Sequence, residues 1–163
     1  DVNTYVEGRL LDDDGAALLR FEKGVSGVLV ASQVCAGEEN GLFIRIYGEK
    51  GGIEWRQMDP NYLIVKWPDR PIEHVHTGNG YMGYYAKANT RTPGGHPEGY
   101  IEAFANIYRN FARTVLAVRN GEEPKPEWLD FPGVEDGIRG MQFIETVITS
   151  GQQQETKWLK WVE

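Results

Sequence analysis

The stretch RTPGGHPEGYIEAFANIYRNFARTVLAVRN, residues 91–120, joins a glycine-rich loop to a strongly periodic segment. Its apolar residues recur at intervals of three and four, at Ile101, Phe104, Tyr108, Phe111, Val115 and Val118. This spacing predicts an amphipathic helix that begins beside His96 and Pro97 and ends at Gly121. The loop therefore places His96 at the start of a helix, where free backbone N–H groups favour a polar or anionic ligand.

The sequence on either side of this stretch predicts a second helix and a series of strands. Residues 134–150 repeat the helical spacing, with Ile138, Met141, Ile144 and Ile148 on the inward side. Upstream, short alternating runs are separated by turns rich in Gly, Asp and Pro, which is typical of an antiparallel meander. The predicted strands cover residues 4–11, 16–22, 25–35, 42–47, 53–58, 62–67 and 72–77, with a closing strand over residues 157–162.

Strands followed by two helices indicate an α+β fold, an open, mainly antiparallel sheet with two main helices packed on one face. The other face carries Phe43, Arg45 and Tyr47, with Trp55 or Met58 beside them depending on the strand register. Because a mixed aromatic and charged face is too apolar to stay exposed over a wide area, we expect it to be available for dimerisation. An ordinary solvated face with scattered aromatic residues is the alternative.

Length and composition limit the possible classes of protein. The 163 residues suit a single domain, residues 1–163, and the net charge of −7 argues against nucleic acid and anionic membranes as partners. No apolar run reaches the roughly 18 residues of a membrane span and no signal peptide is visible, so we expect a cytoplasmic protein. The chain starts with Asp1, as a piece of a longer protein would. The single cysteine, Cys35, excludes an internal disulfide and is expected to be buried.

Motifs for the common catalytic classes are missing from the sequence. The loop Gly78-Asn79-Gly80 comes nearest to a dinucleotide-binding turn, but no helical pattern follows it. His74 and His76 share one face of a predicted strand, and with His96 and Glu98 they could form a metal site. Plain surface histidines are the simpler interpretation. We therefore assign no catalytic, cofactor-binding or metal-binding residue.

Three residues remain as candidates for binding a substrate. His96 could contact a ligand, or it could only cap the helix. Arg91 could hold a carboxylate or sugar hydroxyls through its planar guanidinium group, or it could form a surface ion pair. Tyr100 could offer its ring to a sugar, or it could simply pack the loop.

Four segments resemble the C-terminal domain of the Gfo/Idh/MocA oxidoreductases, the relatives of glucose–fructose oxidoreductase and inositol dehydrogenase. They are DDGAALLRFE (residues 13–22), ASQ (31–33), YGEKGGIEW (47–55) and GHPEGY (95–100). The resemblance covers nearly the whole chain in order, and the HPEGY run is similar to a narrower subgroup of sugar or polyol dehydrogenases. It implies an N-terminal Rossmann domain that binds NAD or NADP, followed by an open sheet that forms part of the substrate pocket and the dimer.

The sequence departs from the complete family pattern at the catalytic positions. The family's Glu-Lys-Pro lysine is absent, since Glu22-Lys23 and Glu49-Lys50 are each followed by Gly. The aspartate and histidine that the family places four residues apart are absent as well. We expect both features, together with the Rossmann domain, to lie upstream of Asp1 in the parent protein. Only His96, and more weakly Arg91 and Tyr100, correspond to a stretch near the family's substrate pocket.

These observations give one leading hypothesis and two alternatives. The chain is expected to be the substrate-binding and dimerisation domain of an NAD(P)-dependent sugar or polyol oxidoreductase, with no cofactor of its own and no activity alone. Its partners would be the substrate, a second copy bound through the sheet face, and the missing Rossmann domain. The first alternative is a non-catalytic homodimeric assembly module in which residues 77–95 are merely disordered. The second is a histidine-based metal-binding β-domain.

Overall fold

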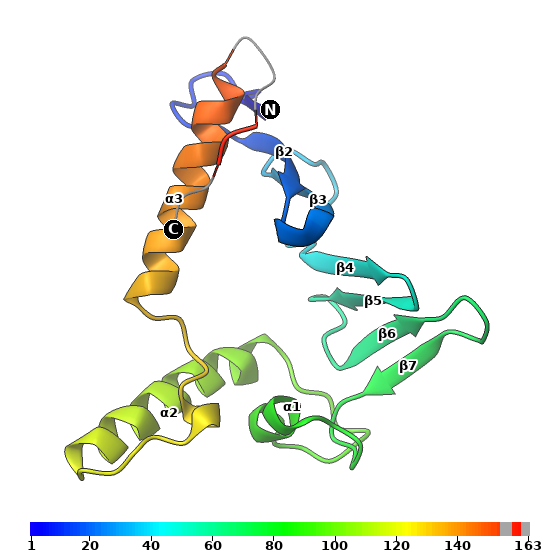
Figure 1. Ribbon diagram of the computed structural model, residues 1–163, viewed down its shortest axis with the longest axis vertical. Helices are drawn as coiled ribbons and strands as arrows, with labels where there is room; N and C mark the ends of the chain where they lie inside the picture. The colour runs from blue at the N-terminus through cyan, green and yellow to red at the C-terminus, as the bar shows by residue number, and fades with distance from the viewer. Residues whose placement is uncertain (154–157, 161–163) are drawn as a thin grey trace. The chain divides into compact units, whose positions relative to one another are not determined.

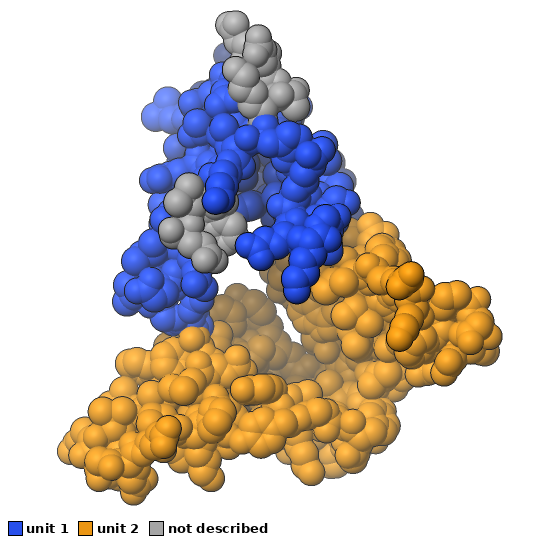
Figure 2. All heavy atoms as spheres, viewed as in Figure 1, with its two compact units in different colours: residues 1–38, 132–163 blue, residues 39–131 orange. Residues whose placement is uncertain are grey.

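The computed structural model describes residues 1–153 and 158–160 and divides the chain into two compact units. One unit contains residues 1–38 and 132–163, and the other contains residues 39–131 (Figure 2). Antiparallel strands form one open sheet in each unit, and helices accompany both sheets (Figure 1). The α+β class with open antiparallel sheets is therefore confirmed, but the strands belong to two sheets.

The first unit contains a three-stranded sheet and one long helix. Its strands β1 (Val2–Asn3), β2 (Asp14–Arg20) and β3 (Ser26–Ser32) are neighbours in that order. A 3₁₀ turn, η1 (Glu22–Gly24), joins β2 to β3, as the turn at Lys23-Gly24 predicted. The helix α3 (Val134–Gly151) ends against β1, where a Cβ on Gly151 would lie 2.9 Å from Cγ2 of Val2.

The prediction of a strand over residues 4–11 is wrong, because a buried carboxylate bends this segment. Asp13 is 3% exposed, and its side chain accepts hydrogen bonds from the backbone N–H groups of Tyr5 (2.8 Å) and Val6 (2.9 Å). These hydrogen bonds hold the pKa of Asp13 below its ordinary value. The buried state expected for Cys35 is also wrong: β3 ends at Ser32, so the thiol falls in the following turn and is exposed.

The second unit contains a four-stranded meander, as the alternating sequence predicted. The strands are β4 (Phe43–Gly48), β5 (Gly51–Arg56), β6 (Tyr62–Lys66) and β7 (Glu73–His76), each paired antiparallel with the next. Glycine is required at the start of β5, because a Cβ on Gly51 would lie 2.5 Å from the carbonyl oxygen of Lys66. The close approach of β6 to the start of β5 therefore leaves no room for a side chain there.

The register decides which side chains share a face of this sheet. Phe43 lies opposite Arg56 and Arg45 lies opposite Glu54, whereas Trp55 lies opposite Ile44. Trp55 is therefore on the other face from Phe43, and Met58 lies beyond the end of β5, so neither joins the aromatic face as expected. The carboxylate of Glu54, 4% exposed, sits on the same face as Phe43. It pairs with Lys66 (2.5 Å) and Arg56 (2.7 Å), which lower its pKa.

Two α-helices follow the sheet in the second unit. The helix α2 (Tyr100–Arg119) confirms the periodic prediction, although it begins at Tyr100 rather than beside Pro97. Its first turn is capped by Glu102, whose carboxylate accepts the backbone N–H of Gly99 at 2.9 Å. A shorter helix, α1 (Tyr84–Asn89), was not predicted, and a 3₁₀ turn, η2 (Pro126–Trp128), follows α2.

The buried face of α2 is polar rather than apolar. Its buried residues are Asn106, Asn110 and Ala117. The apolar stripe that predicted the helix stays exposed, with Ile101 at 79%, Tyr108 at 70% and Val118 at 64%. Three of the four inward residues predicted for α3, Ile138, Met141 and Ile144, are exposed as well, and the fourth, Ile148, is half-buried. Periodicity thus identified both helices, but it did not identify what each of them buries.

The segment between β7 and α2 is a closed loop that contains α1, which disagrees with the disorder of residues 77–95 assumed in the first alternative. Its two ends meet where the backbone N–H of Gly94 donates to the carbonyl of Gly78 at 3.0 Å. Gly78 has a positive φ of 77°, and a Cβ there would lie 2.5 Å from the nitrogen of Gly94. Only glycine satisfies both conditions without strain.

Two further expectations concern a closing strand near the C-terminus and the absence of a membrane-spanning helix. The closing strand predicted over residues 157–162 falls mostly outside the described residues, and residues 158–160 form no strand. In the described part of the chain, no helix combines the length and apolar character that crossing a bilayer requires.

The closed loop gives a direct test with a matched control in the same loop. Replacing Gly78 with Ala should destabilise the protein by about 1–3 kcal/mol, because the new Cβ meets backbone atoms at a strained φ. Gly80→Ala is the control, since a Cβ at Gly80 meets nothing within 4 Å. Chemical unfolding would measure both variants, and equal stabilities would contradict this account of the loop.

Candidate functional site

The loop before α2 is attached to the second sheet by one asparagine. Asn61 lies directly before β6, and its backbone carbonyl accepts the N–H of Thr77 at 2.8 Å. Its side-chain oxygen accepts the backbone N–H of Glu98 at 2.8 Å, and its side-chain nitrogen donates to the carbonyl of Glu98 at 2.9 Å. The amide of Asn61 thus pairs with Glu98 as a neighbouring strand would, and this pairing fixes the residue that precedes the N-cap Gly99 of α2.

The carboxylate of Glu98 closes the loop from inside. Its Oε1 accepts the backbone N–H groups of Arg91 and Thr92, each at 2.6 Å. Burial raises the pKa of Glu98, but the hydrogen bonds from Thr92 and Arg91 outweigh it, so the pKa lies below its ordinary value. The carboxylate is therefore ionised at neutral pH and keeps its full capacity to accept hydrogen bonds.

The hydroxyl of Thr92 connects the Glu98 carboxylate to the histidine. It lies 2.7 Å from the backbone carbonyl of His96 and 2.9 Å from Oε1 of Glu98. A hydroxyl has one proton, so the two acceptors share it or receive it alternately. Residues 91–98 consequently form a small ring of hydrogen bonds that carries His96 on its outer side.

The ring of His96 is exposed and has one free nitrogen among the described residues. Its Nδ1 lies 3.3 Å from the carbonyl oxygen of Pro93 and 3.4 Å from that of Gly94. Carbonyl oxygens only accept hydrogen bonds, so we assign the proton of the neutral ring to Nδ1. The Nε2 atom then carries the lone pair and can accept a hydrogen bond from a ligand hydroxyl.

Arg91 is held by the polar face of α2. Its guanidinium group donates to Oδ1 of Asn106 at 2.7 Å, and Asn106 donates in turn to the carbonyl of Asn89 at 2.7 Å. One turn further along α2, Arg109 donates to the carbonyl of Ala88 at 3.0 Å. Burial lowers the pKa of Arg109, and Arg113 and Arg91 add to the effect. The buried polar side chains of α2 therefore bind the end of α1 and orient Arg91.

Tyr100 occupies the first position of α2 and stays 62% exposed. Its ring centroid lies 4.7 Å from that of Phe104, one turn along the helix. The two rings form an exposed aromatic pair at the helix start, and such rings can pack against the apolar face of a sugar.

The structure therefore places the three predicted residues on one loop and helix start, within the second unit. Among the described residues, no hydrogen bond joins their side chains to one another. The alternative that His96 only caps the helix is wrong, because the N-cap is Gly99 and Glu102 does the capping.

The sequence did not reveal the residues that organise the site. Asn61 follows Asp59-Pro60 and has the sequence of an ordinary turn, while Glu98 was considered as a possible ligand of a metal site. Their pairing spans 37 residues, so no local pattern could indicate it. Asn106 lies among many other polar residues of this amphipathic helix, so nothing in the sequence distinguished it.

The two histidines on β7 serve a different purpose. His74 and His76 flank the ring of Tyr62, with centroid distances of 5.4 and 5.1 Å. In the described ranges, no group of three or more His, Cys, Asp or Glu residues is arranged to hold a metal ion. The metal-site interpretation thus gains no support from the geometry.

The described residues do not fit a dinucleotide either. All strand pairs are antiparallel, whereas the glycine-rich dinucleotide turn links parallel strands through a helix. After Gly78-Asn79-Gly80 the chain enters α1, which has only six residues. We therefore assign no redox step to the described residues of this chain.

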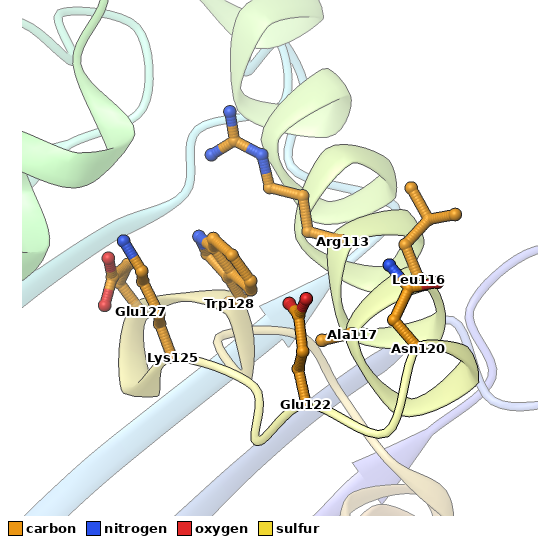
Figure 3. A pocket seen from close by; sticks show the side chains of 8 residues that line it. All are labelled: Arg113, Leu116, Ala117, Asn120, Glu122, Lys125, Glu127 and Trp128. Atoms are coloured by element: carbon orange, nitrogen blue, oxygen red, sulfur yellow. The ribbon is translucent and has the colours of Figure 1, made fainter.

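A separate hollow of about 390 Å³ lies between the second half of α2 and η2 (Figure 3). The side chain of Trp128 stands in it, with the cationic groups of Lys125 and Arg113 at 5.3 and 5.8 Å from the indole. Two carboxylates, Glu122 and Glu127, also line it. Both cationic groups already contact the indole ring, and the two positive charges of the lining are matched by two negative ones, so no charge is left to attract a ligand. The loop around His96 is therefore the better candidate site.

Comparison with known proteins identifies relatives along the whole chain. The uncharacterized oxidoreductase YfiI of Bacillus subtilis (strain 168) is 33% identical over 154 residues, which cover 94% of this chain and 39% of that protein. A crystal structure of an oxidoreductase from Sinorhizobium meliloti is 40% identical with a TM-score of 0.89, over 98% of this chain and 45% of that one.

An inositol dehydrogenase homolog from Azotobacter vinelandii has been crystallised in two complexes. The complex with NAD+ is 28% identical with a TM-score of 0.87, over 97% of this chain and 41% of that one. The complex with NADH and myo-inositol is 29% identical with a TM-score of 0.81, over 89% and 38%. This chain thus spans less than half the length of these relatives.

The family profile described as "Oxidoreductase family, C-terminal alpha/beta domain" matches residues 2–160. The match covers the two sheets and the helices described above, and it includes the loop that carries His96. The chain therefore belongs to the Gfo/Idh/MocA oxidoreductase family, as a C-terminal alpha/beta domain of that family.

Proposed function

We propose that this chain is the substrate-binding and dimerisation part of an NAD(P)-dependent oxidoreductase that acts on a sugar or polyol. The observation that carries the proposal is the ring of His96, exposed on a hydrogen-bonded loop with Nδ1 against two carbonyls. A fixed ring with a free acceptor nitrogen suits the hydroxyl groups of such a substrate. The nicotinamide nucleotide and the residues that transfer protons would belong to the rest of the parent protein.

The relatives support this assignment. The Azotobacter vinelandii homolog is crystallised with NADH and myo-inositol, a cyclic polyol, and this chain covers 38% of it. A C-terminal domain that contains no dinucleotide turn leaves the cofactor to another domain, and small-molecule pockets occur preferentially where two domains meet. We therefore propose NAD or NADP as the cofactor of the parent protein.

The three candidate residues would divide the recognition of the substrate among them. His96 would accept a hydrogen bond from a substrate hydroxyl through Nε2. Arg91, oriented by Asn106 at 2.7 Å, would donate hydrogen bonds to oxygen atoms of the substrate. Tyr100 would pack its exposed ring against the ring of the substrate.

A homodimer through the sheet face is the second part of the proposal. The edge strand β4 presents Phe43 at 53% and Tyr47 at 66% exposure, with the exposed Arg45 between them. Aromatic residues and arginine are enriched in protein interfaces, and the Glu54 ion pairs on the same face provide a polar surround. This surface also fits the alternative of a purely structural homodimer.

Replacing His96 with Ala in the full-length protein tests the substrate role. Turnover with NAD and either myo-inositol or D-glucose should show a KM raised by about tenfold, the equivalent of one hydrogen bond. His74→Ala is the matched control and should keep the KM of the unaltered protein. If the protein turns over neither myo-inositol nor D-glucose, or if His96→Ala leaves the KM unchanged, the result would favour the structural homodimer.

The isolated chain of 163 residues should neither bind NAD nor oxidise a polyol, since no pair of parallel strands in its described ranges could frame a dinucleotide turn. Titration calorimetry with NAD and with NADP should show no saturable heat, and absorbance at the nicotinamide band should not change when myo-inositol is added. Saturable binding of either nucleotide would contradict the assignment of the cofactor to another domain.

Charge placed on the proposed interface should separate the subunits. Replacing Tyr47 with Glu should shift sedimentation from dimer to monomer, because a carboxylate would lose its water at the interface. Ile46→Thr, on the opposite face of the same strand, is the control and should leave the dimer intact. A monomeric unaltered protein at high concentration would contradict the dimer.

A further inference from the structure

We propose that Asn61 and Glu98 are positioning residues that fix the ring of His96 for a substrate hydroxyl without touching the substrate themselves. The inference rests on the function proposed above, because it takes His96 as the residue that meets the hydroxyl. It assigns a role to Asn61, which lies outside the segments that resemble the family, and to Glu98, which lies within one of them but is not among the candidate substrate-binding residues. Three successive sets of hydrogen bonds, which lead from Asn61 to the ring of His96, support this inference.

The first step is the attachment of Asn61 to the sheet. Asn61 precedes β6, and its backbone carbonyl accepts the N–H of Thr77, so β6 and the residue after β7 hold it in place. The orientation of its amide is then set by Glu98, which needs an acceptor for its N–H and a donor for its carbonyl. Aspartate has the same shape but lacks the donor, so it would present an oxygen to the carbonyl of Glu98.

The second step runs from the backbone of Glu98 to its side chain. With the backbone fixed, the carboxylate reaches back across the loop to the N–H groups of Arg91 and Thr92, each at 2.6 Å. Hydrogen bonds to a charged acceptor are shorter and stronger than neutral ones. Glutamine would keep an acceptor oxygen at this position, whereas alanine would leave two backbone donors without a partner.

The third step connects the closed loop to the imidazole. Thr92 contacts the carbonyl of His96, and the N–H of His96 donates to the carbonyl of Pro93 at 3.1 Å. Gly95, with a positive φ of 84°, makes the tight turn between them. This turn brings the carbonyls of Pro93 and Gly94 to Nδ1, which fixes the tautomer and leaves Nε2 as the acceptor.

The test follows the tautomer of His96 by nitrogen NMR on the chain labelled with ¹⁵N-histidine. The unaltered chain should show His96 with its proton on Nδ1, and His74 and His76 serve as internal references. Glu98→Ala and Asn61→Asp should each shift His96 toward the proton on Nε2, whereas Glu98→Gln should retain the Nδ1 tautomer. A merely structural role would lower the melting temperature of the variants and leave the tautomer of the folded protein unchanged.

The effect on substrate recognition is measured as the KM and kcat of the full-length protein. The assay contains NAD and either myo-inositol or D-glucose, whichever the protein oxidises. Glu98→Ala should raise the KM by about tenfold with little change in kcat, and Glu98→Gln should stay within about twofold of the unaltered protein. If His96→Ala raises the KM but Glu98→Ala and Asn61→Asp change neither the KM nor the tautomer, the positioning role is refuted while the proposed function stands. If His96→Ala leaves the KM unchanged, the proposed function fails and this inference fails with it.

Discussion

The pairing of the Asn61 amide with the backbone of Glu98 is the contact on which the organisation of the candidate site depends. It joins the second sheet to the start of α2 through hydrogen bonds of 2.8 and 2.9 Å. Without it, the carboxylate of Glu98 would have no fixed starting point from which to reach Arg91 and Thr92. A polar network of this kind, which is here only partly buried, specifies one arrangement when every member is satisfied.

The helix α2 has two chemically different faces, and they serve different purposes. Its buried side chains, Asn106 and Asn110, bind α1 and orient Arg91 through hydrogen bonds. Its apolar stripe remains exposed in the described residues. Exposed apolar surface of this extent is typical of protein that meets further protein. This agrees with a chain that spans less than half the length of its relatives.

We assigned substrate recognition to this chain and cofactor binding to the rest of the parent protein because of the side chains and strand pairing that this chain contains. Its loops offer hydrogen-bond donors, acceptors and aromatic rings at one end of the second unit, which suits the recognition of a polyhydroxy substrate. In the part of the chain that the structure describes, the paired strands are all antiparallel, so no glycine-rich turn links parallel strands as a dinucleotide site requires. Membership of the Gfo/Idh/MocA family explains this combination, because the matching profile describes a C-terminal domain.

The sequence by itself determined the two long helices, most of the strands and the family. The three-and-four spacing of residues 101–118 specifies a helix because i to i+4 hydrogen bonds are local. Alternation and glycine turns specified β4 to β7 in the same way, whereas residues 4–11 alternate but bend around the buried Asp13. The HPEGY run contains two of the candidate residues, His96 and Tyr100, and it indicated the family through a resemblance, which needs no knowledge of contacts.

Only the tertiary structure decided which face of α2 is buried, how the strands divide into two sheets, and what holds His96. Each of these depends on residues that meet after the chain reverses direction, such as Asn61 and Glu98, 37 positions apart. A local pattern reports the hydrogen bonds that a segment makes with itself. A local pattern does not indicate which distant backbone group will form a hydrogen bond with a polar side chain, and such hydrogen bonds position the site.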